Sequence, residues 1–365
     1  MIDESDIDWY LKNIELPGKS VIDHPGFISE NLGDQGKTYA RNVSVPEDIY
    51  VNIEEKLDKP RKLYKIGKRF GYRYTKIFGL PKRSEVSKSA FKKSTRKFLK
   101  YLESICYWSQ GKSNIEYEKN MLNLSVEDFL VCNKNGSGNL FLGAAAGFWS
   151  YMVENKEVEA IQTNCKGRGD ERCRIKIAPR YELEDSFEAG MEKVDFGFSR
   201  DYKIFNKIRD TEYAENSMKD YEKIGFFEHR NGLFVHGNMR YIWTGLSLIE
   251  ILENELEDFD DVLFDCAFQA GRKIPKNEAC EGMKVFLVEY LSATGWGDTR
   301  VRKDGEGYQV ESFMFPWTKF TSDTSFPIFR GMVSGIITKF KQSEIKLKTI
   351  RKHDEGVTYT IVAEE

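Results

Sequence analysis

The pattern of apolar and polar positions along the chain predicts a mixture of helices and short strands. The apolar run over 140–149 predicts a buried helix, because it is about half the roughly 20 residues that a membrane-spanning helix needs. Apolar and polar residues alternate over 158–164, 172–177, 344–351 and 357–362, as they do in hairpin strands with one buried face. We therefore expect an α+β protein and not a doubly wound parallel sheet.

Two segments of the chain match two later segments in the same order. Residues 63–76 align without gaps on 263–276, and both are expected to be helical. A Gly-x-x-x-Gly pair at 143–147 aligns on a second pair at 331–335, and a charged, strand-like stretch follows each. Two matches in one order predict an internal duplication.

The duplication predicts two domains, over residues 1–180 and 196–365, with the acidic stretch 181–195 as the linker. Each domain is expected to begin with a short strand pair, near 26–29 in the first and near 232–235 in the second. Helices, a β-ribbon, the glycine-containing helix and a final hairpin follow in each.

The first glycine-containing helix is a candidate ligand site. Gly143 and Gly147 are four residues apart and so share one helix face, where another backbone or a ligand can approach closely. Close helix packing is the simpler interpretation. The functional interpretation is the floor of a pocket, formed with Phe148 and Trp149.

The composition is that of a folded protein, with 40% hydrophobic residues and nine prolines in 365 residues. Six scattered cysteines do not resemble a disulfide framework. The first residues, MIDESDIDWYLKN, carry acids where a secretory signal carries basic residues. We expect a cytoplasmic protein with reduced thiols.

Charge is distributed unevenly along the chain. The net charge is −3, yet residues 62–100 contain fourteen lysines and arginines against one acid, Glu85. An ordinary solvated helix face is the plainest interpretation of this basic segment. A surface for an anionic membrane or a protein partner is the next interpretation, and a nucleic-acid partner is less favoured.

The most specific local signal is CKGRGDERC, in which Cys165 and Cys173 flank a turn that contains Gly167 and Gly169. A hairpin of this length brings two thiols to one side, and the glycines permit positive φ in the turn. Two thiolates are half of a tetrahedral zinc site, so the other ligands must come from elsewhere. The alternative is a pair of buried free cysteines.

At this hairpin the chain resembles the 4-vinyl reductase domain family, whose members end in Glu-x-x-Cys-x-Gly-x-Gly-Asp-x-x-Cys after a Gly-x-x-x-Gly helix. The matching positions are Cys165, Gly167, Gly169, Asp170 and Cys173. The resemblance covers most of residues 20–178, and the second half looks like a degenerate copy without the cysteines. Gln162 replaces the family's Glu, and Cys132 or His353 is a candidate for a further zinc ligand.

The resemblance implies two tandem domains, each an antiparallel sheet packed against helices, and a pocket for a small hydrophobic or aromatic molecule. The family and its relatives include sensory domains of phenol- and toluene-responsive activators, proteins of chlorophyll vinyl reduction and, distantly, TRAPP vesicle-tethering subunits. Since these often form dimers, the tandem chain is expected to form an intramolecular pseudo-dimer.

No reaction is evident from the residues, since no GxGxxG turn follows a predicted strand and the four histidines are far apart. The leading expectation is a non-catalytic protein that binds or senses a small hydrophobic ligand. The alternative is an assembly or membrane-surface adaptor similar to the TRAPP subunits, acting through the basic segment. A tetrapyrrole vinyl reductase comes third.

Overall fold

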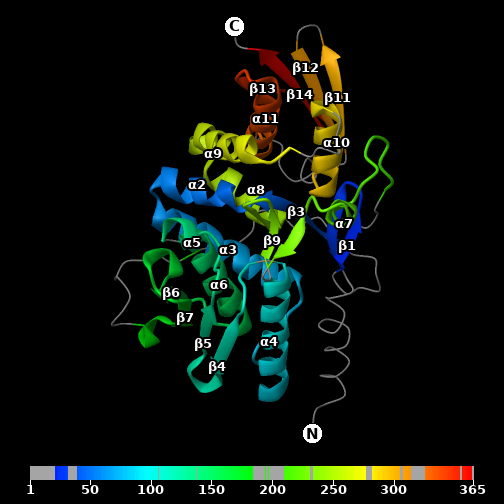
Figure 1. Cartoon of the computed structure of the whole chain (residues 1–365). Coiled ribbons are helices and arrows are strands. Elements are labelled where there is room, and N and C mark those ends of the chain that lie inside the picture. The colour runs from blue at the N-terminus through cyan, green and yellow to red at the C-terminus, as the bar shows by residue number, and fades with distance from the viewer. Residues whose placement is uncertain are drawn as a thin grey trace.

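The computed structural model describes residues 21–31, 39–105, 107–136, 138–183, 194, 196, 209–230, 233–276, 282–304, 307–313, 325–353 and 356–363. Cys106, Cys280 and most of the predicted linker 181–195 lie outside these ranges. Antiparallel sheets pack against helices throughout the described part, so the predicted α+β class is confirmed (Figure 1).

A central sheet contains strands from both halves of the chain, in the order β1-β2-β3-β10-β9-β8. Its strands are β1 (Val21–His24), β2 (Phe27–Asn31), β3 (Tyr39–Pro46), β8 (Glu228–Arg230), β9 (Leu233–His236) and β10 (Met239–Gly245). The two halves meet where β3 pairs with β10 in antiparallel register, for example Val45 with Ile242. The halves therefore share one hydrogen-bonded sheet.

The first half continues with a four-stranded sheet in the order β4-β5-β7-β6. Its strands are β4 (Lys112–Glu116), β5 (Met121–Val126), β6 (Val158–Asn164) and β7 (Cys173–Pro179). Its helices are α2 (Glu47–Leu57), α3 (Pro60–Ile77), α4 (Lys88–Ser104), the short α5 (Cys132–Asn135) and α6 (Asn139–Met152). Three 3₁₀ turns complete this half: η2 (Tyr117–Lys119) connects β4 to β5, η3 (Lys166–Arg168) lies between β6 and β7, and η4 (Arg180–Glu182) follows β7. The predicted hairpin over 158–177 is thus β6 and β7.

The second half has a four-stranded sheet in the corresponding order, β11-β12-β14-β13. Its strands are β11 (Asp298–Asp304), β12 (Gly307–Phe313), β13 (Ile345–His353) and β14 (Gly356–Ala363). Its helices are α7 (Met218–Lys223), α8 (Leu246–Glu255), α9 (Asp260–Lys273), α10 (Met283–Ala293) and α11 (Pro327–Lys341), with η6 (Glu257–Phe259) before α9. From β3 and β10 onward, the two halves therefore run through matching strands and long helices.

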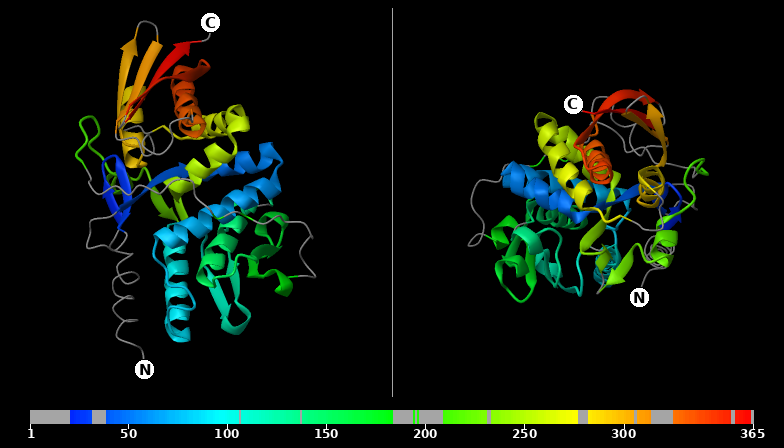
Figure 2. Two further views of the ribbon diagram at one scale, coloured as in Figure 1. Left: turned by 180° about the vertical axis from the view of Figure 1, so that it is seen from behind. Right: turned by 45° about the horizontal axis from the view of Figure 1, so that its top comes forward.

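Figures 1 and 2 show the two four-stranded sheets at opposite ends of the molecule, with the central sheet and helices α2, α3, α8 and α9 between them. Two contacts connect these helices across the halves. Asn52 on α2 donates to the Cys266 carbonyl on α9 (2.9 Å), and the buried Arg73 on α3 pairs with Glu250 on α8 (3.3 Å). The halves are thus packed through helices as well as through the sheet.

Glycines allow α3 and α6 to cross with their backbones in contact. A Cβ added at Gly143 would lie 2.0 Å from the Tyr64 carbonyl oxygen, and one at Gly147 would lie 1.9 Å from that of Lys68. Gly71 on α3 faces α6 in the same way, 1.9 Å from the Ala144 oxygen. These distances exclude any side chain from the crossing.

The second half repeats this crossing between α9 and α11. A Cβ at Gly331 would lie 2.2 Å from the Phe264 oxygen, and one at Gly335 would lie 2.2 Å from that of Phe268. The Gly-x-x-x-Gly pairs that align in the sequence therefore occupy equivalent crossings. Among the described residues, no helix has the length and apolar character needed to cross a membrane.

The candidate ligand cavity and the cysteine cluster

An apolar cavity of about 40 Å³ lies between α3, α4, α6 and the sheet of β4 to β7. Side chains from all four elements line it, among them Phe70, Phe98, Leu102, Phe141, Phe148 and Ile177. The hollow forms where the small residues Gly71, Ala144 and Ala145 face these rings. Charged side chains are absent from its described lining, so the cavity suits an apolar occupant.

The size of the cavity limits what it can hold in this conformation. A cavity of about 150 Å³ accommodates benzene, whereas this one is several times smaller. Phe98 on α4 and Phe148 on α6 stack across it, with ring centroids 5.1 Å apart. Leu102, also on α4, is partly exposed. An aromatic ligand therefore requires α4 or these side chains to move outward.

Of the four residues predicted to bind a ligand, the structure places Phe148 on this cavity. Gly143 and Gly147 face α3 at the helix crossing. Trp149 is fully buried away from the cavity lining, and its indole Nε1 donates to the Asn120 carbonyl (2.6 Å). The contribution of α4 to the cavity was not predicted, because the apolar positions of this helix are interleaved with lysines.

Three cysteines converge at one end of this sheet. Cys132 begins α5, Cys165 directly follows β6, and Cys173 begins β7. All three are buried, their Sγ atoms lie within 4.8 Å of one another, and those of Cys132 and Cys173 are 3.2 Å apart. Cys132, one of the two candidates for a further ligand, thus joins the predicted pair. His353 ends β13 in the other four-stranded sheet.

The remaining residues of the CKGRGDERC motif build the turn that carries the cysteines. Gly167 packs against α5 so closely that a Cβ would lie 1.9 Å from the Cys132 carbonyl oxygen. Gly169 has φ of 96°, which favours glycine. Asp170 accepts a hydrogen bond from the Cys165 amide (2.6 Å), and this bond lowers the pKa of Asp170. The two glycines and the aspartate of the motif therefore have structural roles beside the thiols.

A hydrogen bond between the Cys132 and Cys173 thiols shifts their pKa values in opposite directions. A hydrogen bond from Cys132 lowers the pKa of Cys173 to about 6, and the Lys166 amide also donates to the Cys173 sulfur (3.4 Å). The same sulfur–sulfur bond, together with burial, raises the pKa of Cys132. The shared bond therefore favours the thiolate on Cys173 and the thiol on Cys132.

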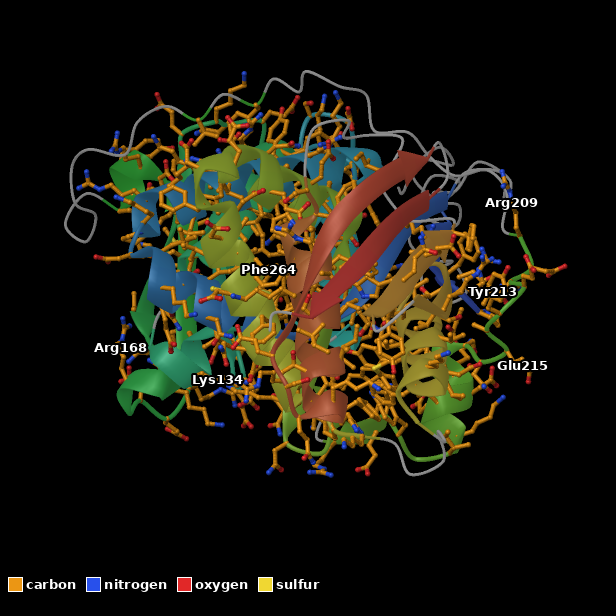
Figure 3. The ribbon with its side chains drawn as sticks, turned by 90° about the horizontal axis from the view of Figure 1, so that it is seen from above. Lys134, Arg168, Arg209, Tyr213, Glu215 and Phe264 are labelled. Atoms are coloured by element: carbon orange, nitrogen blue, oxygen red, sulfur yellow. The ribbon has the colours of Figure 1, made fainter. Side chains whose placement is uncertain are left out.

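Gln162 stands where the family pattern has a glutamate, and it faces the cluster. Its Nε2 lies 3.2 Å from the Cys132 sulfur. Lys134 on α5 and Arg168 on η3, the elements next to the cysteines, lie on the same side of the molecule (Figure 3). Three sulfur ligands are soft donors, so the cluster could hold a metal ion.

The loop before Cys132 is held by the second half of the chain. Val131 has φ of 67°, a strained value for a β-branched residue, and its amide donates to Glu47 (2.7 Å). Arg240 on β10 pairs with Glu47 (3.3 Å) and donates to the Asp128 carbonyl (3.2 Å). The position of Cys132 thus depends on a contact between the halves.

Comparison with known proteins does not assign the chain to a family. No family model matches the chain, and no curated protein matches it. Among solved structures, the chain is similar to a vinyl-4-reductase family protein from Methanocaldococcus jannaschii. The identity is 12%, the match covers 32% of this chain and 88% of that one, and the TM-score is 0.25.

Proposed function

We propose that this protein binds a small hydrophobic molecule in the cavity of its first half and does not catalyse a reaction on it. The observation that carries the proposal is the cavity itself, which aromatic and aliphatic side chains from three helices and a sheet enclose. Burial of apolar ligand surface contributes about 25 cal/mol per Å². Because aromatic rings form much of the cavity lining and aromatic pairs gain stabilisation beyond buried area, aromatic hydrocarbons are the favoured ligand class.

Binding is coupled to the position of α4. Because the cavity of about 40 Å³ is too small for a benzene ring, the ligand must displace the α4 side chains Phe98 and Leu102. The outward movement of this helix is the signal that a sensor would transmit. In this scheme the ligand is recognised by shape and apolar contact, without a polar anchor.

The two halves are tandem 4-vinyl-reductase-like copies, over residues 1–180 and 196–365, that pair as an intramolecular pseudo-dimer. The matching strand orders of the two four-stranded sheets support this arrangement. The equivalent glycine crossings also support it. The first copy keeps the cysteines and the ligand cavity, and the second serves as its structural partner.

The cysteine cluster binds zinc through Cys132, Cys165 and Cys173. Its three thiols fit a site with three protein ligands, and Gln162 or a water molecule would complete it. Zinc would supply structural cross-linking of α5 to the β6–β7 turn. Since the Phe129 carbonyl contacts the Cys132 sulfur (3.5 Å) and the Phe129 ring lines the cavity, the metal would also stabilise a cavity wall.

Toluene tests the ligand proposal directly. Isothermal titration of the purified full chain is expected to show binding, and native mass spectrometry reports any ligand retained from expression. Leu102→Trp fills the cavity and is expected to abolish toluene binding. The control is Leu233→Trp, a partly exposed leucine on β9. Absence of toluene binding, or equal binding by the two variants, contradicts the proposal.

Zinc is tested by elemental analysis of the purified protein. One zinc per chain is expected, and Cys132→Ser is expected to reduce it to trace levels. Cys266→Ser, a buried cysteine on α9 outside the cluster, is the matched control. Full zinc content in Cys132→Ser would refute the three-cysteine site while leaving the ligand proposal intact.

A further inference from the structure

The basic segment 62–100 divides into an internal part and an external part. On α3, the buried Lys68 pairs with Glu159 (2.8 Å), and Arg73 pairs with Glu250 (3.3 Å). Arg69 pairs with Glu255. These three cations stabilise the fold and are not available to a partner, whereas α4 carries exposed cations next to hollows in the surface.

Four of the six cations on α4 form one stripe. Lys93, Arg96, Lys97 and Lys100 follow the i, i+3, i+4, i+7 spacing that places residues on the same helix face. Lys93, Arg96 and Lys100 are exposed, whereas Phe91, Phe98 and Leu99 are buried. The helix therefore contributes apolar side chains to the protein interior and presents its charges outward.

The stripe continues into two adjoining hollows. Arg96, Lys100 and Lys112 line a hollow of about 290 Å³ between α4 and the start of β4. Lys112 also lines a second hollow of about 410 Å³ on the β4–β5–β7–β6 sheet, together with Arg174 and Lys176. We call these five cations the cationic groove. It runs from α4 across three strands of the sheet.

The strand register places cations of the groove side by side across the sheet. Ser125 on β5 pairs with Lys112 on β4 and with Arg174 on β7. Neighbouring strands lie about 4.8 Å apart, so the Lys112 and Arg174 backbones are separated by about 10 Å. Asn114, Asn123 and Thr163 also line the sheet hollow, where the Asn123 amide donates to the Glu116 carboxylate (3.0 Å). Such hydroxyl and amide groups are hydrogen-bonding partners of phosphate oxygens.

Nearby acids leave most of this charge uncompensated. Within the described ranges, Arg96, Lys100 and Lys112 form no ion pair. Glu103, which lies in the α4 hollow, accepts a hydrogen bond from the Gly111 amide (2.8 Å). Asp170 interacts with Arg174 at the edge of the groove but is also held by the Cys165 amide. The groove therefore has a net positive charge.

The shape of the groove and its neighbouring side chains distinguish between anionic partners. A membrane is flat and would favour exposed apolar side chains for insertion, but the exposed large apolar residues of the described chain are Tyr181, Ile224, Val285 and Phe313. Of these, Tyr181 lies in the segment that adjoins the groove, since Lys176 donates to the carbonyl of the next residue, Glu182 (2.8 Å), and the Tyr181 side chain is exposed there. An exposed aromatic ring beside a charged groove is typical of single-strand binding.

We propose that the cationic groove binds the phosphate backbone of single-stranded nucleic acid and that Tyr181 stacks on a base. The cations would bind the backbone independently of sequence. The hollow accepts a linear chain of phosphates more readily than a flat bilayer. This function would be additional to ligand binding, and the groove lies on the outer face of the same α4 helix that encloses the cavity.

The test uses the full chain and fluorescein-labelled oligo(dT) of 20 nucleotides, with binding followed by anisotropy between 50 and 300 mM salt. The variant Arg96→Gln/Lys100→Gln/Lys112→Gln/Arg174→Gln is expected to bind at least tenfold more weakly. The slope of the logarithm of the binding constant against the logarithm of the salt concentration is expected to become less steep by about 0.7 for each phosphate that the variant no longer neutralises. Tyr181→Ala is expected to weaken binding about tenfold relative to Tyr181→Phe.

The matched control removes the same charge from exposed cations of the second half, as Lys219→Gln/Arg272→Gln/Lys284→Gln/Lys341→Gln. This control and the wild type should bind oligo(dT) equally, and all proteins should have similar melting temperatures. The proposal is overturned if the wild type does not bind at 50 mM salt, or if groove and control variants bind alike. Tighter groove-dependent binding to phosphatidylserine vesicles or to polyglutamate would also overturn it.

Discussion

At the scale of single residues, the two glycines of the CKGRGDERC turn have different surroundings. Gly167 faces the backbone of Cys132, whereas a Cβ at Gly169 would meet nothing within 4 Å. The motif glycines are therefore required for different reasons. One allows α5 to approach the hairpin, and the other only allows a left-handed turn conformation.

Gly167→Ala is expected to destabilise the protein by about 1–3 kcal/mol, as overpacking does, and to move Cys132 away from the other two cysteines. Gly169→Ala is the control, with a cost of about 1 kcal/mol from the positive φ alone. Urea denaturation measures stability, and elemental analysis measures bound zinc. Equal zinc loss in both variants would contradict this distinction.

The Cys173 thiol predicts a pH dependence of stability in the metal-free protein. Its folded pKa of about 6 lies below the ordinary value of 9.0, so the folded state binds fewer protons than the unfolded state between these values. Stability is therefore expected to rise between pH 6 and pH 9, on the order of 1–4 kcal/mol.

Denaturation of chelator-treated protein at several pH values measures this effect, and Cys173→Ser is expected to flatten the profile. Cys266→Ser should retain it, because burial raises the pKa of Cys266 to about 12, outside the tested range. A profile that is unchanged in Cys173→Ser would show that other groups control the pH dependence.

At the scale of elements, the sequence predicted the parts that have a regular apolar pattern. The predicted helices over 63–76 and 140–149 and the predicted hairpin strands correspond to α3, α6, β6, β7, β13 and β14, because each of these segments has a continuous or regularly spaced apolar pattern in its own sequence. The expected strand pairs near 26–29 and 232–235 correspond to β1–β2 and β8–β9, although Gly26 lies in the turn between β1 and β2.

Strands β3 and β10 were missed for a physical reason. Both are buried on both faces in the centre of the sheet, so polar residues such as Arg41, Ser44 and Thr244 interrupt the expected alternation. Arg41 is satisfied by the carbonyls of Gly26 (2.7 Å) and Gly295 (3.0 Å), which are distant in sequence. Likewise, Cys132 joins the cluster through a fold that local spacing does not specify.

The α3–α6 crossing reverses the usual effect of a glycine-to-alanine substitution in a helix. Alanine normally gains about 1 kcal/mol over glycine in a helix interior. Gly147→Ala, however, places its Cβ 1.9 Å from the Lys68 oxygen, so we expect a loss of about 3 kcal/mol or more as the helices separate. Ala146→Gly, at the preceding position of α6, controls for helix propensity. A more stable Gly147→Ala would contradict the crossing.

At the scale of the whole molecule, the halves are joined by buried contacts as well as exposed ones. Arg73 and Glu250 are both buried, whereas Lys56 on α2 and Asp265 on α9 form an exposed pair (3.4 Å). Breaking a buried ion pair leaves a desolvated charge, but an exposed pair contributes little. The two kinds of contact should therefore respond differently to mutation.

Glu250→Gln is expected to lower the free energy of unfolding by about 3–5 kcal/mol, and Lys56→Gln by less than about 1 kcal/mol. Because the halves share one sheet, both should unfold together. Hydrogen exchange can be followed separately in the β4–β7 and β11–β14 sheets. Faster exchange in only one sheet of Glu250→Gln would show that the halves unfold independently.

The pairing of β3 with β10 also has a consequence for protein abundance. Two separate chains joined by such a strand pair would dissociate on dilution, and their activity would depend on how much of each was made. Here both strands belong to one polypeptide, and the linking chain keeps their effective concentration high at any expression level. Each newly made molecule therefore carries its own partner in fixed one-to-one proportion, and the cysteine loop supported by Arg240 is complete even at a few copies per cell.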